Sequence, residues 1–334
     1  MTEVFLSTLQ QVLVMLFFIA AGYVMERKKA LPSDAAKTLS SLLIHFILPA
    51  YVAYNLSSSI TLQCLSSYAI YLLAGLVCLA LFVGIAWLLS VLFGKLFSER
   101  RLLLYIFAFS NYSYFGYPLI EAVYGAEMLA SVLVFVIPFT IFIYTAGVYM
   151  IAPKHARVVR GRDGRPAMEA KKTRHSLHIQ PVIPALIFGI AMGLAGVDLT
   201  GGSNVFVLAA FGKILLAAKN CMSPLSMLLT GLVLARYTLK ELFSSWKRAV
   251  LALVRLVLIP GIVLGMCMLL RLVTGLNGPE YLLIPVIIAA MPVGMNIVIF
   301  REEDGEESAQ VVFLSLLFSV ATVPLLFMLL AHLG

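Results

Sequence analysis

Long apolar stretches alternate with short polar connections along nearly the whole chain. A helix needs about 20 mostly apolar residues to cross a bilayer, and ten stretches reach or approach that length. Their expected positions are 5–25, 35–56, 67–94, 102–124, 128–151, 181–197, 205–235, 249–273, 281–300 and 308–331. The pattern therefore predicts an all-α integral membrane protein with ten transmembrane helices.

Two of these stretches, the fourth and the ninth, are interrupted by proline, glycine and asparagine. The interruptions cover residues 110–118 and 290–296. A break inside a bilayer leaves backbone amides and carbonyls unpaired, which hydrocarbon does not tolerate. Such a break persists only where it is buried in protein or lines a cavity. The two broken helices therefore predict a place where something polar binds.

A single long polar segment, 152–180, divides the chain into 1–151 and 181–334, with five predicted spans in each part. It is basic and poor in large apolar residues, which is typical of a mobile linker. Because each half has an odd number of spans, the second is expected to be inverted relative to the first. Interrupted spans at matching places favour two inverted five-helix repeats. The alternative is ten unrelated spans that match by chance.

Composition and charge agree with a membrane protein. Hydrophobic residues make up 62% of the chain and charged residues 12%, so little sequence remains for a soluble domain. The net charge of +8 could suggest nucleic acid, but all except four of the 24 Lys and Arg residues lie in alternate connections. This positive-inside pattern predicts a multi-pass protein of the plasma membrane, with both termini outside and linker 152–180 cytoplasmic. Membrane lipids, rather than nucleic acid, are the expected partners of the basic loops.

The two breaks supply the candidate substrate-binding residues. Pro118 suits the first position of a half-helix, whose free N–H groups attract an anion. Asn111, Ser113 and Gly116 precede it and add polar groups and room for close backbone approach. The matching residues of the ninth span are Pro292, Gly294 and Asn296. The alternative is a pair of proline kinks packed against neighbouring helices.

Three ionisable residues within the spans leave alternatives open. Glu121 either stabilises the first turn after Pro118 or carries a proton or cation. Lys219 in the seventh span either binds at the site, to a substrate carboxylate or to Glu121, or extends to the outer surface. His45 in the second span is a pH-sensitive group or a packed histidine with satisfied hydrogen bonds. We count Lys219 with the substrate-binding candidates, and Glu121 and His45 as candidates for ion coupling.

No recognised catalytic motif occurs. The chain lacks a G-x-x-x-x-G-K-[ST] loop, an H-E-x-x-H motif and a serine–histidine–acid arrangement, so we predict neither an enzyme nor a cofactor. His175 and His178 lie in the linker without further ligands, and no metal site is expected there. Arg255 and Arg271 are expected to reach lipid headgroups. Gly189 and Gly193 have the spacing that allows close helix packing.

These features together resemble the auxin efflux carrier family, and most closely its short-loop bacterial members. The resemblance covers essentially the whole chain and rests on ten spans, a central basic loop and two motif runs. One run holds Asn111, Gly116 and Pro118 and ends in Gly125. The other run holds Ala290, Met291, Pro292 and Asn296.

The resemblance implies two inverted five-helix repeats in which the broken helices 4 and 9 cross, similar to bile-acid and sodium–proton transporters. Spans one, two, six and seven would form a scaffold, through which a homodimer would form, and the others a moving transport domain. Asn111, Pro118, Pro292 and Asn296 would lie at the crossover. Members of the family carry organic anions: auxin in plants and dicarboxylates similar to malate or malonate in bacteria. Glu121 and Lys219 depart from the pattern expected for the family.

We therefore predict a secondary active transporter that moves a small organic anion, a mono- or dicarboxylate, across the plasma membrane by alternating access of the elevator type. The coupling ion is left open between H⁺ and Na⁺, so a sodium-coupled organic anion symporter is one alternative. The other is a membrane sensor or signalling protein that uses linker 152–180 as its output.

Overall fold

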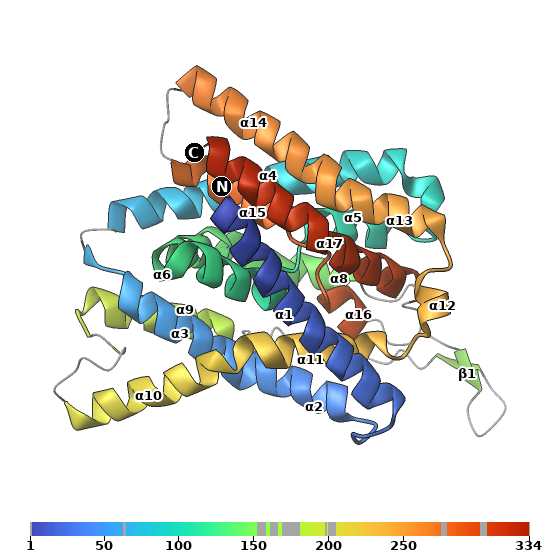
Figure 1. The fold of residues 1–334 in the computed structure, drawn as a ribbon, viewed down its shortest axis with the longest axis horizontal. Helices are drawn as coiled ribbons and strands as arrows, with labels where there is room; N and C mark the ends of the chain where they lie inside the picture. Colours follow the sequence, from blue (N-terminus) through green and yellow to red (C-terminus); the bar gives the residue numbers. More distant parts are fainter. Residues whose placement is uncertain are drawn as a thin grey trace.

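Helices account for nearly all of the chain that the computed structural model describes, which is residues 2–62, 65–151, 158–160, 166–168, 181–197, 199, 205–274, 279–300 and 306–333 (Figure 1). The helices of the first half are α1 (Thr2–Arg27), α2 (Ala35–Leu42), α3 (Leu48–Ser59), α4 (Leu65–Leu92), α5 (Arg100–Ala108), α6 (Tyr117–Phe135), α7 (Ile137–Phe142) and α8 (Val148–Ile151). Shorter turns are η1 (Leu43–Ile47), η3 (Gly94–Leu96), η4 (Tyr112–Gly116) and η5 (Ile143–Gly147), all π-helical except the 3₁₀ turn η3.

The second half is built from similar elements. Its helices are α9 (Val182–Leu194), α10 (Phe206–Asn220), α11 (Met222–Leu234), α12 (Leu239–Leu242), α13 (Trp246–Leu253), α14 (Ile259–Thr274), α15 (Pro279–Ala290), α16 (Asn296–Phe300) and α17 (Glu306–Leu333). A π-helical turn, η6 (Val254–Leu258), joins α13 to α14. Helices α15 and α16 are separated by the non-helical residues 291–295.

Seven helical segments of the described chain are long and apolar enough to cross a membrane. They are Thr2–Arg27, Ala35–Ser59, Ser66–Leu92, Tyr112–Phe135, Phe206–Leu234, Trp246–Val273 and Glu306–Leu333. Val182–Leu194 and Ile137–Gly147 are shorter apolar helices. The structure thus supports a helical multi-pass membrane protein. The count of ten spans and the inverted repeat stay predictions, because the predicted fourth and ninth spans are divided into shorter segments.

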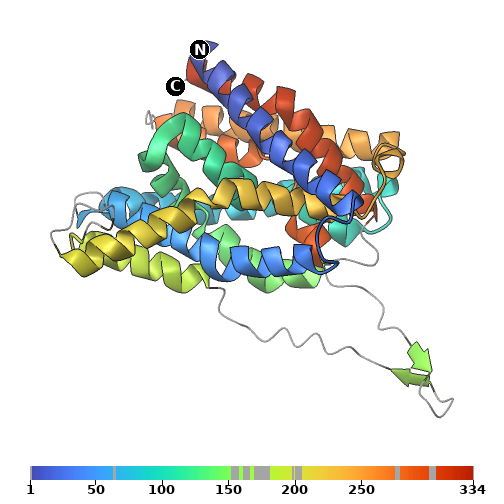
Figure 2. The same ribbon diagram turned by 60° about the horizontal axis from the view of Figure 1, so that its bottom comes forward.

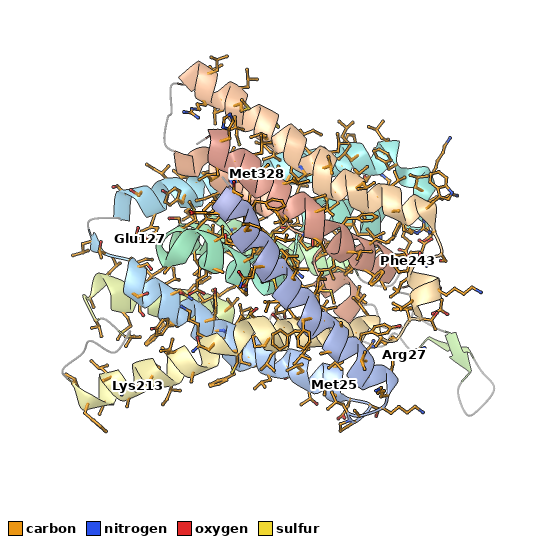
Figure 3. All side chains as sticks on the ribbon, viewed as in Figure 1. Met25, Arg27, Glu127, Lys213, Phe243 and Met328 are labelled. Carbon is orange, nitrogen blue, oxygen red and sulfur yellow. The ribbon has the colours of Figure 1, made fainter. Side chains whose placement is uncertain are left out.

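Helices α1 and α17 pack against each other, and the two termini lie at the same end of the bundle in both ribbon views (Figures 1 and 2). Arg27 and Phe243 lie towards one end, whereas Glu127 and Lys213 lie towards the other (Figure 3). Which end faces the cytoplasm stays a prediction.

Part of the linker forms a small hairpin. Strands β1 (Val158–Arg160) and β2 (Pro166–Met168) pair antiparallel, with Val158 opposite Met168. The hairpin is set apart from the helices (Figure 2). Strands of three residues are too short to leave an alternating pattern, so the sequence did not predict them. The rest of the predicted linker 152–180, including His175 and His178, lies outside the described residues.

Glycines permit the closest contacts between helices. A Cβ atom on Gly231 of α11 would lie 2.0 Å from the Ile19 carbonyl oxygen of α1. On Gly193 of α9 it would lie 2.7 Å from the carbonyl oxygen of Ile60, at the end of α3, and Gly189 meets Ala53 in the same way. The packing role predicted for Gly189 and Gly193 is therefore confirmed. In lipid such close approach replaces the hydrophobic driving force between helices.

Candidate functional site

The fourth and ninth predicted spans are both broken, as predicted. Helix α5 ends at Ala108, and the next helical turn, η4, starts at Tyr112. Helix α15 ends at Ala290, and α16 starts at Asn296. Between these helices the chain is not helical, and the backbone of Phe109 is extended, with φ −118° and ψ 124°. Each span therefore supplies two helical parts and a short extended segment between them.

The two extended segments cross and pair with each other. Ser110 and Val293 form an isolated antiparallel β-bridge. The Asn111 N–H donates to the Pro292 carbonyl oxygen at 2.7 Å, and the Gly294 N–H donates to the Phe109 carbonyl oxygen at 3.3 Å. Backbone N–H and C=O groups that lack helical partners at one break thus form hydrogen bonds with the other break, as a low-dielectric interior requires. The two predicted breaks therefore meet, and their backbones pair with each other.

Pro118 lies in the first turn of α6, as predicted, but the helical part after the break starts earlier than the sequence indicated. The helix after the break starts at Tyr112, with Asn111 in the capping position, and continues through η4 into α6. A π-helical turn, in which the Tyr117 N–H bonds to the Tyr112 carbonyl, precedes Pro118. Proline removes one backbone donor, and the carbonyl of Tyr114, four residues earlier, instead accepts a hydrogen bond from the Ser226 hydroxyl of α11 at 3.2 Å.

A cavity lies at the crossover. Its volume is about 20 Å³, which is the room that one water molecule needs. Its walls are formed by Leu48, Tyr105, Ser110, Asn111, Tyr112, Ser113, Tyr117, Thr140, Ile143, Val182, Gly294, Met295 and Asn296. Of the predicted site residues, the structure thus brings Asn111, Ser113, Gly294 and Asn296 together around one space.

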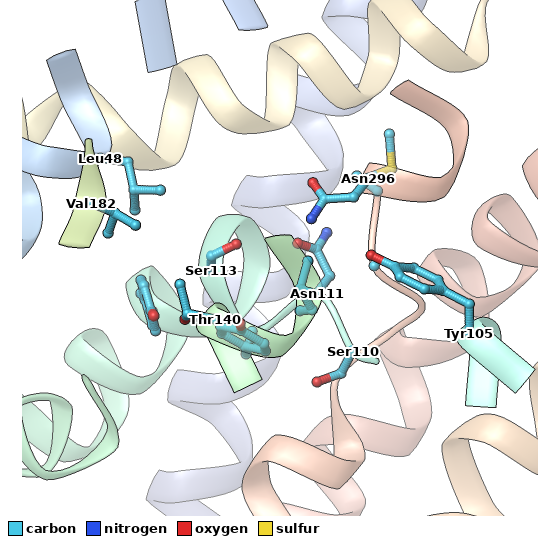
Figure 4. A pocket seen from close by; sticks show the side chains of 13 residues that line it. Leu48, Tyr105, Ser110, Asn111, Ser113, Thr140, Val182 and Asn296 are labelled. Carbon is cyan, nitrogen blue, oxygen red and sulfur yellow. Dashed lines mark hydrogen bonds between the residues drawn. The ribbon is translucent and has the colours of Figure 1, made fainter. Parts of the chain in front are cut away.

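The two asparagines face each other across this cavity. The side chains of Asn111 and Asn296 point toward one another (Figure 4). Asn111 is only 2% exposed, and its Nδ2 has no hydrogen-bond partner among the described residues. The other polar groups of the wall include the hydroxyls of Tyr112 and Thr140, which are 3.1 Å apart. Among the described residues of its wall, the cavity therefore presents neutral hydrogen-bond donors and no charged side chain.

Three predicted site residues shape the crossover without lining the cavity. Gly116 lies next to Met291 of the second broken span, at a distance where an added Cβ atom would make an ordinary van der Waals contact of 3.4 Å with the methionine side chain. Pro292 contributes the carbonyl that pairs with Asn111. Pro118 is buried within the continuous helix.

Lys219 and Glu121 pair with each other. The Lys219 ammonium on α10 forms an ion pair with the Glu121 carboxylate on α6. The Tyr51 hydroxyl donates to Glu121 Oε2 at 2.6 Å, and Lys219 Nζ donates to Asn55 Oδ1 at 3.0 Å. Lys219 Nζ also lies 4.8 Å from the ring centroid of Tyr54. The pairing predicted for Lys219 with Glu121 is confirmed, and its extension to the outer surface is wrong.

This ion pair lies outside the crossover cavity. Neither Glu121 nor Lys219 is among the residues of its wall. Glu121 also lies well beyond the first turn after the break, which starts at Tyr112, and the first turn of α6 contains no acidic residue. The predicted role of Glu121 in stabilising that first turn is therefore wrong.

His45 is not brought to the site. It lies in η1 with its side chain exposed, and its Nδ1 is 2.9 Å from the Ser41 carbonyl oxygen. No group of three or more His, Cys, Asp or Glu residues in the described part of the chain could hold a metal ion. The crossover cavity and the Glu121–Lys219 pair are therefore two separate polar centres.

Sequence reasoning missed the residues that complete these centres. Asn55 and Tyr51 hold the ion pair, and Thr140 contributes to the cavity wall. Asn55 is an amide within an apolar span, and intramembrane polar groups are functional candidates by default. That signal could have identified Asn55. Nothing in the local sequence indicates that Tyr51 and Thr140 face polar partners.

The predicted contact of Arg255 with lipid headgroups is also wrong. Arg255 lies in η6 and is 0% exposed. Its Nη1 donates to the Ala289 carbonyl oxygen at 2.6 Å, whereas its Nε and Nη2 have no partner among the described residues. Ala289 belongs to the last turn of α15, where a cation interacts favourably with the free carbonyls. Arg255 therefore holds the end of the helix that leads into the crossover.

Arg255→Met should raise the unfolding temperature of the purified protein. A fully buried charge with incomplete partners costs several kcal/mol, so an apolar replacement of similar length is expected to stabilise the fold. Differential scanning fluorimetry in detergent measures this change. Arg271→Met is the matched control, because Arg271 lies at the other end of α14, where it donates to the Leu333 carbonyl. A lower unfolding temperature for Arg255→Met would show that the guanidinium contributes net stability.

Residues 7–327 match the profile of the membrane transport protein family, the domain of the auxin efflux carriers. The chain belongs to this family. The match covers nearly the whole chain and confirms the resemblance that the two motif runs indicated. Comparison with curated proteins finds no match. This membrane transport protein therefore carries its polar cavity where its two broken spans cross.

Proposed function

We propose that this membrane transport protein is a secondary active transporter for a small organic anion, a mono- or dicarboxylate, which binds at the crossover. The observation that supports the proposal is the buried Asn111 amide, whose Nδ2 has no hydrogen-bond partner in the described part of the chain and which faces Asn296 across the cavity. A buried donor left unpaired costs about 1–3 kcal/mol. A carboxylate oxygen would satisfy this donor, and the hydroxyls of the wall would complete its hydrogen bonds.

The cavity must open before such a substrate can enter. Its volume of about 20 Å³ is far below the roughly 300–1,000 Å³ of ordinary ligand sites. The described conformation is thus a closed one, and we propose that a relative movement of two parts of the bundle opens it. Alternating exposure of a fixed central site is the usual outcome of such movement in transporters built from inverted repeats.

Helix packing supports a division into a scaffold and a transport domain. Helix α1 packs on α11, and α3 packs on α9 and α10, which together are spans one, two, six and seven. In the other group α4 packs on α5, as α14 packs on α15. Both groups contain pairs that an inverted repeat would relate. We propose that the first group is a scaffold, able to form a homodimer, and that the second moves in an elevator-type transition.

The Glu121–Lys219 pair crosses the proposed boundary between these domains. Glu121 lies on α6, whereas Lys219 and Tyr51 lie on α10 and α3 of the proposed scaffold. Movement of the transport domain must therefore separate the pair. Protonation of Glu121 would remove its charge and weaken the contact, which couples transport to H⁺. Replacement of the proton by Na⁺ is the alternative. The proposed setting is the plasma membrane, with the linker cytoplasmic and both termini outside.

A carboxylate screen tests the proposal. Acetate, lactate, malonate, malate and succinate are added to the detergent-purified protein, and the unfolding temperature is measured. A ligand at 100 times its Kd stabilises a protein by about 2.7 kcal/mol, so a bound carboxylate should raise this temperature. Malonamide, the neutral analogue of malonate, should not. Hits are then tested for flux in proteoliposomes, and the absence of both stabilisation and flux would contradict the proposal.

A further inference from the structure

A second, open cavity lies at one end of the bundle, where α4, α13 and α17 have their ends. Its volume is about 390 Å³, and it shares no residue with the crossover cavity. It is a groove lined by Lys95, Leu96, Phe97, Ser98, Ser244, Ser245, Trp246, Lys247, Arg248 and Glu307. We call it the basic groove. It is formed by segments from both halves of the chain.

The basic groove retains a net positive charge. The ammonium groups of Lys95 and Lys247 are on exposed side chains that make no ion pair within the described residues. Among the described residues of the wall the one acid is Glu307, which forms an ion pair with Arg248. Its Oε2 also accepts hydrogen bonds from Ser98, at 3.0 Å from the backbone N–H and 2.5 Å from the hydroxyl. The acid is therefore neutralised by its own partners, and two cations remain for a ligand.

Arg248 connects the segments that form the wall of the basic groove. The Arg248 Nη1 donates to the Leu96 carbonyl, and its guanidinium lies 5.2 Å from the ring centroid of Phe97. Arg248 and Glu307 thus tie the connection after α4 to the starts of α13 and α17. Lys95 and Lys247 therefore lie on segments that these contacts hold together, rather than on independent loops.

The residues around the groove indicate that it lies at the level of the lipid headgroups. Trp246, which starts α13, is 69% exposed, and tryptophan prefers the headgroup level of a bilayer. The same helical segment continues through η6 and presents the exposed apolar side chains Leu253, Val257 and Leu258. The basic groove thus lies at the end of a surface that suits acyl chains.

We propose that the basic groove binds the phosphate of an anionic phospholipid, with Lys95 and Lys247 as its cationic ligands. Basic pockets between membrane helices bind such headgroups, and the apolar side of α13 and α14 accommodates the acyl chains. Inorganic phosphate offers the same charge but lacks these apolar contacts. The site is independent of the substrate proposed for the crossover.

The experiment compares the wild-type protein with Lys95→Gln/Lys247→Gln. Both are purified in detergent and titrated with dioleoyl phosphatidylglycerol or dioleoyl phosphatidylcholine, and binding is measured by native mass spectrometry. The wild type should bind phosphatidylglycerol in preference to phosphatidylcholine. The double variant should lose affinity on the order of 30-fold, given the typical contribution of one lysine near anionic lipid. Lys28→Gln/Lys37→Gln removes the same charge from exposed positions outside the groove and should bind as the wild type does.

Three outcomes would overturn the proposal. Equal phosphatidylglycerol binding by the wild type and Lys95→Gln/Lys247→Gln would exclude the two lysines. Equal binding of phosphatidylcholine would exclude recognition of the anionic headgroup. Displacement of phosphatidylglycerol by millimolar inorganic phosphate would assign the groove to free phosphate. Each readout detects lipid rather than transport, so it holds whatever the substrate is.

Discussion

Replacing both Asn111 and Asn296 with alanine should abolish carboxylate transport while the protein remains folded. A hydrogen bond to a charged group contributes about 1.5–3 kcal/mol, so each lost amide should reduce affinity roughly 10- to 150-fold. The two amides face the same cavity, so both substitutions weaken the binding of the same ligand. The measurement is the initial rate of uptake into proteoliposomes of the carboxylate that stabilises the wild type most.

Two further variants make this result specific. Asn111→Asp keeps the size of the side chain but places a negative charge at the crossover, so it should be as defective as the alanine variant. Gln10→Ala removes an exposed amide of α1 outside the site and should transport normally. Unfolding temperature and elution from a sizing column report whether each variant is folded. Unchanged transport by the folded Asn111→Ala/Asn296→Ala variant would remove the crossover from the mechanism.

Lys219→Met should destabilise the protein more than the double variant Glu121→Gln/Lys219→Met does. The single change leaves the Glu121 carboxylate inside the bundle with Tyr51 as its remaining hydrogen-bond partner. Breaking a fully buried pair costs about 3–5 kcal/mol. For Lys219→Met we expect the free energy of unfolding to fall by about 1–3 kcal/mol, because the side chains of Lys219 and Glu121 are 13% and 24% exposed. The second change removes the uncompensated charge and should restore much of the stability. The unfolding temperatures and uptake rates of the wild type, Glu121→Gln, Lys219→Met and the double variant measure the energetic coupling between the two residues.

The same set of variants tests ion coupling. If Glu121 carries the proton, uptake by the wild type should follow a pH gradient, and Glu121→Gln should lose that dependence. Uptake that follows a sodium gradient instead would assign coupling to sodium. Additive effects of Glu121→Gln and Lys219→Met would contradict an energetic link between the two residues, whatever the coupling ion.

Several features of the fold were predictable because the bilayer imposes them on any sequence. Apolar length indicates helices, and unpaired backbone groups in hydrocarbon must be satisfied within the protein. Proline, glycine and asparagine therefore located the two breaks approximately: the predicted ranges were 110–118 and 290–296, and the non-helical residues are 109–111 and 291–295. Matching breaks in the two halves also predicted that they meet, and the Ser110–Val293 bridge confirms this.

Local sequence was less informative about where the half-helix starts. Pro118 is compatible with a first helical position, but a π-helical turn before it and the Ser226 hydroxyl opposite the Tyr114 carbonyl make a helix interior equally acceptable. The second of these partners is more than 100 residues away in the sequence. Its contribution could not be predicted from a local pattern.

The sequence by itself determined that this protein is a helical membrane protein with two paired breaks, because hydrophobic length and backbone hydrogen bonding are local properties. Only the tertiary structure decided which polar side chains meet. Asn111 faces Asn296, Lys219 reaches Glu121, and Arg255 turns to the end of α15 instead of to lipid. These choices depend on the rotation and crossing of packed helices, which place residues from distant segments within a few ångströms of each other.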